Sequence, residues 1–417
     1  MAIQGLRTTS NFVTGQRPLN WREGILLLDP NGDTPLLGLT AAMKKRETDD
    51  PEFNWWEKSL STRRLQLTSS ATALTSSNTT VTLDATNGNG KSVKEGDLLR
   101  VAETGEIVRV TADPTSDTSI TIQRSWGDTA ATALDTTAAG KNPWLIVIGS
   151  VYEEGSLAPS GVNFDPTKKY NYTQIFRGTL EMTRTASKTR LRTGDAVKEA
   201  KRECLQYHGI DMERAFWLGD RIETTVNGKP ARSLGGYLWL LSNYNSGSNI
   251  ANAKTDYPSG VTMAGLEEYM YDIFQYGSSE KMAFCGNRSL LTINQIVRKN
   301  SQFNIQSGIK EYGMDVSRLM TPFGTLVLKN HPLFNQDVGG TTAGTAYYGM
   351  ESWMAVCDMA QFKYVYLTGS DTKYEPVLQS NGMDGMQSGY ITECSLEIAH
   401  PVTHYLVKNL VAAAVDA

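Results

Sequence analysis

The chain has 417 residues, 40 basic and 44 acidic side chains and a formal net charge of −4, which excludes a strongly basic nucleic-acid binder as the default class. Its length predicts two or three domains, and a hydrophobic fraction of 40% excludes a wholly disordered chain. Four scattered cysteines and four histidines exclude a disulfide scaffold and leave little material for metal or acid–base chemistry.

The N-terminal segment, MAIQGLRTTSNFVTGQRPLN, lacks the apolar stretch of a secretory signal. The longest strongly apolar run, near Trp144–Val151, is far shorter than the roughly 18 residues that a membrane-spanning helix needs. We therefore expect a soluble protein without a membrane partner, made in a reducing compartment.

Residues 1–60 are typical of an arm that needs other surfaces to bury its apolar groups. One short helix is predicted after Thr34-Pro35, over LLGLTAAMKKR, with its basic residues at the favourable C-terminal end. Trp21, Trp55 and Trp56 lack a periodic set of apolar neighbours, so they must dock elsewhere, on the same chain or on another one. We take these three tryptophans as candidate contacts between subunits.

Residues 63–145 are predicted to form an inserted small all-β domain. Threonine is enriched there, with 16 in residues 68–140. Short alternating runs of β-branched residues, punctuated by turn signals, indicate a small antiparallel sheet or barrel. The predicted strands are TTVTL (79–83), DLLRV (97–101), EIVRVTA (106–112) and SITIQR (119–124).

A long helix is predicted over 195–218, with Asp195 as its N-cap and Gly219 at its end. Apolar or small residues recur in it at three- and four-residue spacing, which indicates one buried stripe. This stripe consists of Val197, Ala200, Cys204, His208, Met212, Ala215 and Phe216.

The approach to this helix and its first turns are basic. Two interpretations stay open: a solvated helix face with carboxylate partners, or a face that meets a polyanion or an acidic neighbouring subunit. The basic residues are Arg184, Lys188, Arg190, Arg192, Lys198, Lys201 and Arg202.

After residue 230 the pattern predicts mixed helices and strands, without a repeat period. GGYLWLLS (235–242) suits a strand or buried turn, whereas 265–277 and 287–300 are predicted helices. Strands are predicted at 281–286, within 323–334 and 346–367, and as one long strand within 390–410 that Pro401 interrupts.

Three motifs could carry chemistry, and each favours a structural interpretation. The loop Ala85–Ser92 resembles a phosphate loop, but a strand rather than the required helix is predicted after it. His400 and His404 flank Pro401 without a third ligand nearby in sequence. Cys204 and His208 lie on the apolar stripe of a helix, where cysteine usually packs inertly. We therefore predict no enzyme, no metal and no cofactor.

The order of these elements resembles the major capsid (major head) protein of tailed phages, the Johnson fold of Hong Kong 97 type. The segments that carry the resemblance are YNYTQIFRGTLEMTRTASKTR (170–190) before the long helix, FWLGDRIE and GGYLWLL after it, AFCGNRSLLTINQI (283–296) and SLEIAHPVTHYLVKNL (395–410).

The resemblance implies an α+β fold with an N-terminal arm (1–60) and an extended loop (46–62 and 146–180). It also implies a peripheral domain (181–225 and 371–399) whose spine helix is 195–218, and an axial domain (226–370 and 400–417). The insertion at 63–145 would lie on the outer surface as a decoration or brace.

The implied function is structural: self-assembly into hexamers and pentamers of an icosahedral or elongated head that encloses double-stranded DNA. The basic stretch would then face the interior and contact packaged DNA non-specifically. Portal, scaffolding and possible decoration proteins would be partners, and the protein would be assembled in the host cytoplasm and reside in the virion.

Two alternatives from other classes remain. One is a phage tail or fibre protein that binds a receptor or glycan through its β-rich region, although the long helix counts against it. The other is an enzyme of an unrecognised type, which the scarcity of histidine and of convergent motifs disfavours.

Overall fold

The computed structural model describes residues 45–58, 63–68, 75–85, 88–134, 143–189, 195–245, 247–300, 304–311, 314–336, 340–342, 345–347 and 349–413. Trp21 and most of the helix predicted at 36–46 lie outside these residues. The end of that predicted helix, Lys45-Arg46, lies instead in strand β1 (Lys45–Thr48).

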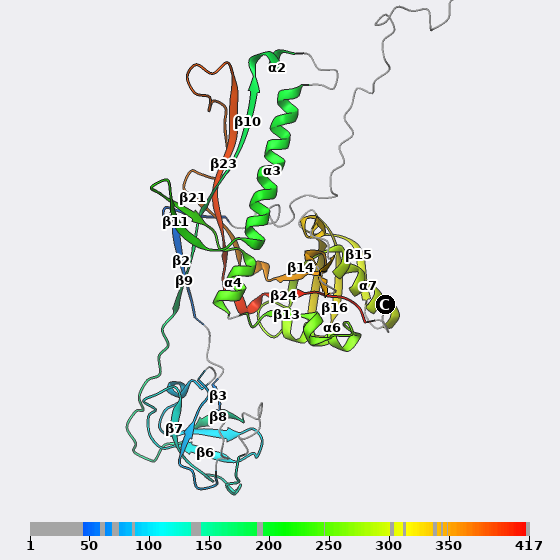
Figure 1. The fold of residues 1–417 in the computed structure, drawn as a ribbon. Helices are drawn as coiled ribbons and strands as arrows, with labels where there is room; N and C mark the ends of the chain where they lie inside the picture. The colour runs from blue at the N-terminus through cyan, green and yellow to red at the C-terminus, as the bar shows by residue number, and fades with distance from the viewer. Residues whose placement is uncertain are drawn as a thin grey trace, which may run out of the picture. The chain divides into compact units, whose positions relative to one another are not determined.

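The chain divides into two compact units, one formed by residues 56–168 and the other by 1–55 together with 169–417 (Figure 1). The smaller unit is wider than the predicted insertion at 63–145. It also includes much of the segment assigned to an extended loop.

The smaller unit contains a six-stranded antiparallel sheet closed into a barrel. Leu67 bridges to Leu83, which joins the first and last strands of the sheet, and the Asp84 amide donates to the Gln66 carbonyl at 2.9 Å. Inward side chains such as Leu65, Leu99 and Val108 form a core of their own. In spatial order the strands are β3 (Arg64–Gln66), β8 (Trp144–Ser150), β5 (Asp97–Val101), β6 (Ile107–Val110), β7 (Ser119–Gln123) and β4 (Thr80–Thr82).

The larger unit contains a five-stranded sheet beside the long helix α3 (Ala196–Leu218). Strand β10 pairs antiparallel with β23 over ten residue pairs, although the two are far apart in sequence, and α3 packs along this strand pair (Figure 1). The short helix α2 (Arg184–Lys188) follows β10. The strands of this sheet are β1, β21 (Phe362–Leu367), β23 (Gly385–Ile398), β10 (Gln174–Thr183) and β22 (Lys373–Glu375).

The same unit contains a mixed seven-stranded sheet whose central strands are buried on both faces. One face joins the core around α3 and α4 (Tyr237–Tyr244), and the other packs against helices α5 (Ala253–Asp256), α6 (Met263–Ile273) and α7 (Asn287–Asn300). In order, its strands are β13 (Ile250–Asn252), β24 (Tyr405–Lys408), β20 (Met354–Cys357), β14 (Glu280–Cys285), β17 (Gly324–Asn330), β16 (Met314–Thr321) and β15 (Asn304–Glu311).

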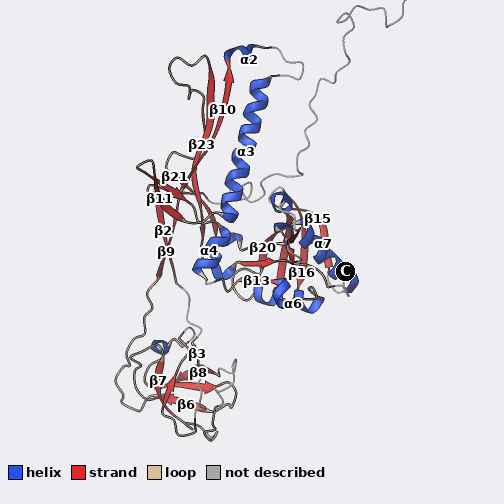
Figure 2. Ribbon diagram, viewed as in Figure 1, coloured by secondary structure: helices blue, strands red, loops and turns tan. Residues whose placement is uncertain are grey.

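Smaller elements complete the fold, in which strands outnumber helices (Figure 2). Three two-stranded ribbons join β2 (Glu52–Glu57) to β9 (Thr167–Tyr172), β11 (Ile222–Val226) to β12 (Lys229–Ser233), and β18 (Gly340–Thr342) to β19 (Thr345–Tyr347). Short 3₁₀ helices are η2 (Gly90–Ser92), η3 (Pro332–Gln336), η4 (Met350–Ser352), η5 (Met359–Gln361) and η6 (Pro401–Thr403).

Most of the predicted elements are confirmed. The four β runs of the insertion are β4 to β7, and the long helix begins and ends as expected, since the Asp195 side chain accepts from the Val197 amide and Gly219 caps the other end. The helices at 265–277 and 287–300 correspond to α6 and α7, and the long late strand is β23, followed by η6 at Pro401 and by β24.

The prediction for GGYLWLLS was wrong, because residues 237–244 form helix α4. The buried residues Tyr237, Leu240 and Leu241 recur at the three- and four-residue spacing of one helix face, which the continuous apolar run YLWLL obscured in the sequence. Two boundaries also differ: β8 belongs to the barrel, and β21 and β10 belong to one sheet with β23. The predicted extended loop (146–180) therefore contains part of β8 from the barrel and part of β10 from the five-stranded sheet. The predicted axial domain (226–370) contains β21 of that same sheet.

Candidate assembly surfaces

The two adjacent tryptophans of β2 face opposite sides of the strand, as alternation in a strand requires. Trp55 is only 6% exposed, with its ring centre 6.0 Å from that of Phe53 and 6.2 Å from that of Tyr244, whereas Trp56 is 66% exposed. Trp55 therefore docks on its own chain, against Tyr244 of α4, and is not exposed for the predicted contact with another subunit. A contact of Trp56 with another subunit stays a prediction.

An arginine clamp holds β9 against the end of α3 and the start of α4. The Arg221 guanidinium stacks between the rings of Tyr170 and Trp239, at 3.8 and 4.2 Å from their centres, and donates to the Tyr170 carbonyl at 2.9 Å. Arginine on aromatic faces is a strong, geometrically fixed contact. This clamp could not be predicted from the sequence, because Tyr170 and Trp239 lie 51 and 18 residues from Arg221.

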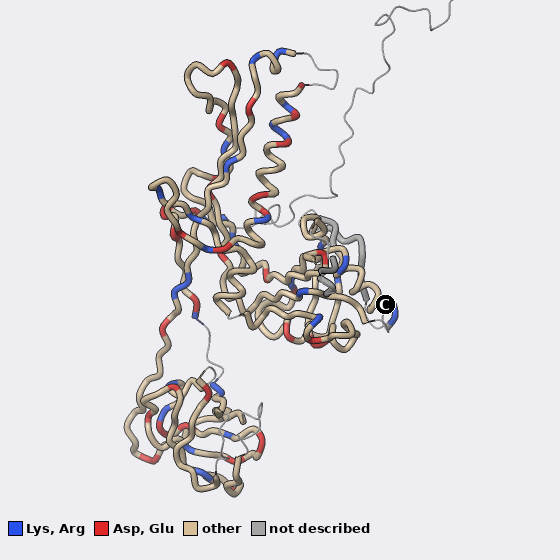
Figure 3. The backbone as a smooth tube through the Cα atoms, viewed as in Figure 1, with Lys and Arg blue, Asp and Glu red and all other residues tan. Residues whose placement is uncertain are grey.

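The basic stretch divides into paired and exposed side chains. Arg184 forms an ion pair with Asp384 at 2.7 Å. The Lys201 ammonium lies 4.7 Å from the centre of the Tyr374 ring. A hydrogen bond with Tyr374 raises the pKa of Lys201. Lys188, Lys198 and Arg202 are exposed, whereas Arg190 and Arg192 lie outside the described residues. Acidic side chains are interspersed with the basic ones on α3 (Figure 3).

Where α3 meets β10, its side chains serve packing. Gly178 brings the strand close to the helix, since a Cβ there would lie 3.2 Å from the Cys204 sulfur. His208 is buried against Thr392, 2.8 Å from its hydroxyl, and burial lowers the pKa of His208 and raises that of Cys204. Both groups are thereby kept neutral, as the packing interpretation predicted.

A buried polar cluster joins the C-terminal half of α3 to the turn after β17. The Glu213 carboxylate lies 2.9 Å from the His331 imidazole and accepts from the Trp217 indole at 3.1 Å. Glu213 and His331 are both inaccessible to solvent, and the Phe334 ring stacks on His331 with ring centres 4.2 Å apart. Such a cluster fixes geometry rather than presenting a reactive group.

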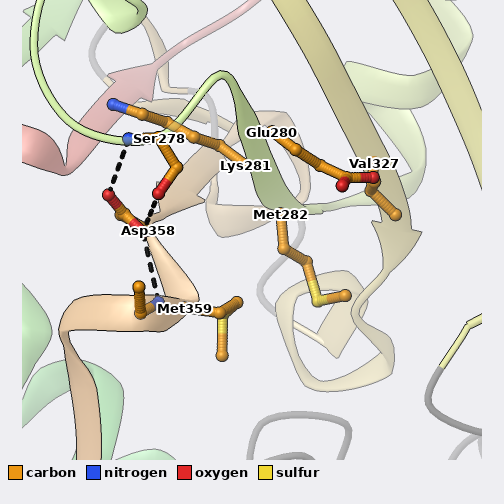
Figure 4. A pocket seen from close by; sticks show the side chains of 8 residues that line it. Ser278, Glu280, Lys281, Met282, Val327, Asp358 and Met359 are labelled. Carbon is orange, nitrogen blue, oxygen red and sulfur yellow. Dashed lines mark hydrogen bonds between the residues drawn. The ribbon is translucent and has the colours of Figure 1, made fainter.

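A cavity of about 460 Å³ lies beside the start of β14 (Figure 4). Its lining includes Asp358, whose carboxylate accepts from the Ser278 hydroxyl and amide at 2.9 and 3.0 Å and from the Ala360 amide at 3.2 Å. Lys281 also lines it, yet its ammonium donates to three backbone carbonyls. These polar groups are satisfied within the chain, so nothing here points to a nucleophile or acid–base pair.

The remaining motifs also favour structural interpretations. In the loop at 85–92 the described residues end in η2, and strand β5 follows instead of the α-helix that a phosphate site needs. His404 is completely buried, which lowers its pKa to about 3. Across the described ranges, His, Cys, Asp and Glu do not gather in groups of three or more that could hold a metal ion.

A membrane-crossing helix would need a longer apolar run than any helix in the described part of the chain offers.

Comparisons with known proteins bear on the whole chain. The model of the SU10 major capsid protein family matches residues 7–411. The major capsid protein of Pseudomonas phage PaMx41 is 25% identical over 397 residues, which cover 90% of this chain and 88% of that protein.

Among solved structures, that of Microbacterium phage Oxtober96 is similar at 11% identity and a TM-score of 0.41, covering 94% of this chain and 96% of that one. The capsid of cyanophage P-SCSP1u is similar at 9% identity and a TM-score of 0.39, covering 62% and 79%. The family match extends over both compact units, and it confirms the resemblance seen in the sequence: the chain belongs to the SU10 major capsid protein family.

Proposed function

We propose that copies of this chain assemble through hexamers and pentamers into the shell of a phage head that encloses double-stranded DNA. Beside family membership, one observation carries the proposal: large apolar side chains are exposed on several elements of the single chain. Trp56 on β2, Tyr207 on α3 and Leu157 between β8 and β9 are all largely exposed in the single chain. Contacts with neighbouring copies would bury them.

The arrangement of elements suggests how the parts are used. The five-stranded sheet with α3 would be the peripheral domain with its spine helix, and the seven-stranded sheet with α5 to α7 would be the axial domain around capsomer centres. The barrel would decorate or brace the outer surface. Portal, scaffolding and decoration proteins would complete a virion assembled in the host cytoplasm.

The exposed cations Lys188, Lys198 and Arg202 support, within this proposal, an interior face that meets packaged DNA. Non-specific contacts of this kind weaken steeply with salt. Reversing the three charges should lower the affinity of capsomers for a duplex DNA fragment at low salt. Unchanged binding would remove this part of the proposal and leave the shell itself untouched.

Electron microscopy and sedimentation velocity of the purified protein test the proposal. We expect rings or closed shells whose fraction rises with protein concentration. Fibres or isolated trimers would favour the tail or fibre alternative. A monomer at every concentration, with and without the scaffolding partner, would contradict self-assembly.

A further inference from the structure

One outer face of the barrel combines arginines with large apolar side chains. On this face Ile146 of β8 lies between Arg64 of β3 and Arg100 of β5, because it is the cross-strand partner of both. Arg100 in turn lies opposite Ile107 of β6, and Leu98 lies opposite Arg109. The outward positions of the six strands hold three arginines and no carboxylate, since Asp97 of β5 is buried. We call this surface the arginine face.

Two of the three arginines of this face lie over aromatic rings, and none is neutralised by a carboxylate in the part of the chain that the structure describes. The Arg64 guanidinium lies 4.5 Å from the centre of the Trp144 ring, and that of Arg109 lies 5.2 Å from Trp126. Within the described residues, no ion pair joins Arg64, Arg100 or Arg109 to a carboxylate. Pre-ordered arginines beside aromatic and aliphatic groups are typical of the centre of a protein interface.

The complementary surface lies on the same unit, in the segment that follows β8. Residues 151–165 contain Glu153, Glu154 and Asp165 and no basic residue, which gives the segment a charge of −3. Every one of these residues is exposed, including Leu157 at 91% and Phe164 at 42%. An extended stretch with unburied apolar groups needs a partner surface.

Within one chain, this segment does not lie on its own arginine face. Its anchors are elsewhere: the Val151 amide donates to the Gly96 carbonyl at 2.8 Å, and the Ser160 hydroxyl donates to Asp113 at 2.9 Å. Leu157, at 91% exposure, is not buried on this barrel, whereas Val151, Tyr152 and Phe164 are each more than half covered. The Ser156 amide donates to the Glu153 carbonyl at 3.1 Å, so the segment turns there and presents Glu153, Glu154 and Leu157 to solvent.

We propose that the arginine face of one copy binds the acidic segment 151–165 of a second copy. The guanidinium groups of Arg64 and Arg100 would pair with the carboxylates of Glu153 and Glu154, and Leu157 and Phe164 would cover Ile146 and its neighbours. Each copy offers both surfaces, so the contact is head-to-tail and closes into a ring under cyclic symmetry. This inference rests on the proposed self-assembly and names a surface for it.

A charge-swap series tests the contact in the full chain. The variants R64E/R100E and E153R/E154R should each raise the protein concentration needed for assembly about tenfold or more, because both leave like charges facing one another. Combining all four changes in one chain should restore most of the loss. The matched control is K91E, a charge reversal at an exposed residue of η2 on the same barrel, which should assemble normally.

A second measurement does not depend on shells. Protein carrying R100C, mixed with protein carrying E154C, should form a disulfide-linked pair on mild oxidation, whereas K91C with E154C should not. If the wild-type protein assembles and the R64E/R100E variant assembles equally well, the docking inference is wrong and the proposed function stands. If the wild-type protein does not assemble but R100C and E154C form the specific cross-link, the docking inference stands and the proposed function is wrong.

A third outcome assigns the face to another partner. If R64E/R100E assembles normally, forms no specific cross-link and loses affinity for duplex DNA, the face binds nucleic acid and the inference is wrong. Circular dichroism and thermal unfolding of each variant identify any chain that has failed to fold. The segment variant E153R/E154R changes only exposed residues and keeps the test decisive if the barrel variant misfolds.

Discussion

Lys281 is a charged side chain at a fully buried position of β14. Its ammonium donates to the carbonyls of Ile273, Tyr276 and Thr403, each at 2.6 Å, and so joins the end of α6 to η6. Burial lowers its pKa from 10.5 to about 8, because the low-dielectric interior disfavours the charged form. The nearby Asp358 carboxylate favours the charged form and so offsets part of this decrease in pKa.

This shift predicts a pH dependence of stability. Between about pH 8 and 10.5 the unfolded chain keeps a proton that the folded chain has released, so the Lys281 contribution to the free energy of unfolding rises with pH across this window. The full shift corresponds to about 3 kcal/mol. The stability of wild type relative to Lys281→Met should therefore increase between pH 7.5 and 10.5, as measured by denaturant unfolding of unassembled protein.

The control for this prediction is Lys299→Met, which removes an exposed lysine from α7 of the same domain. Its stability should follow the wild-type curve with pH, apart from a constant offset. Parallel curves for wild type and Lys281→Met would show that Lys281 titrates at an ordinary pKa and that the buried ammonium is not constrained as described.

At the scale of elements, α3 and α4 meet through two glycines. The Gly236 amide donates to the Gly219 carbonyl at 2.7 Å, where α3 ends and α4 begins. A Cβ on Gly236 would lie 2.7 Å from the Ala215 carbonyl oxygen and 2.8 Å from the Gly219 nitrogen. These are backbone atoms, so they cannot move aside as a flexible side chain would.

Gly236→Ala should therefore separate the two helices and lower the free energy of unfolding by about 1–3 kcal/mol, the usual cost of overpacking. Gly161→Ala is the matched control, since a Cβ there meets nothing within 4 Å. Thermal and denaturant unfolding of the two variants measure the difference. Equal stabilities would mean that the junction relaxes easily.

The features of the fold that could be predicted are those that neighbouring residues in the sequence determine. The ends of α3 were predictable because Asp195 and Gly219 act locally, and the barrel strands were predictable because alternation within a strand is also local. Helix α4 was not, because its short apolar run also suits a strand and the partners that bury Tyr237, Leu240 and Leu241 lie far along the chain. The buried roles of Glu213, His331 and Lys281 depend on tertiary contacts in the same way.

The candidate site was predictable only in part. The aromatic residues of the arm indicated that it contacts another surface. Trp55 and Trp56 were both predicted to contact another subunit, although alternation along a strand places their side chains on opposite faces. The arginine face was missed because its residues come from four strands, which only the register of the sheet brings together.

At the scale of the whole molecule, the barrel has a core made only of its own residues, from Leu65 to Leu145 with Val147 against it. Replacing residues 63–150 by a short Gly/Ser linker should therefore leave the cores around α3 and the seven-stranded sheet intact. The far-ultraviolet spectrum should retain the helices, and thermal unfolding should stay cooperative. Loss of cooperative unfolding would show that the barrel is needed for the rest of the chain to fold.

The two tryptophans of β2 separate folding from assembly. Trp55→Ala removes a buried ring from the core beside Tyr244 and should lower the free energy of unfolding by about 3–5 kcal/mol. Trp56→Ala removes an exposed ring and should leave the unfolding of the single chain within about 0.5 kcal/mol. If Trp56 anchors the chain on a neighbouring subunit, the same variant should raise the concentration needed for assembly severalfold, since interface tryptophans often carry much of the binding energy.

Unfolding experiments and sedimentation velocity on both variants distinguish the two roles. Substitution of a core residue should lower stability, whereas substitution of an interface residue should lower assembly and leave stability unchanged. Tyr207→Ala, a substitution of an exposed aromatic on α3, shows whether loss of any exposed ring has the same effect. Normal shells from Trp56→Ala would place the subunit contact elsewhere. Normal stability of Trp55→Ala would contradict its place in the core.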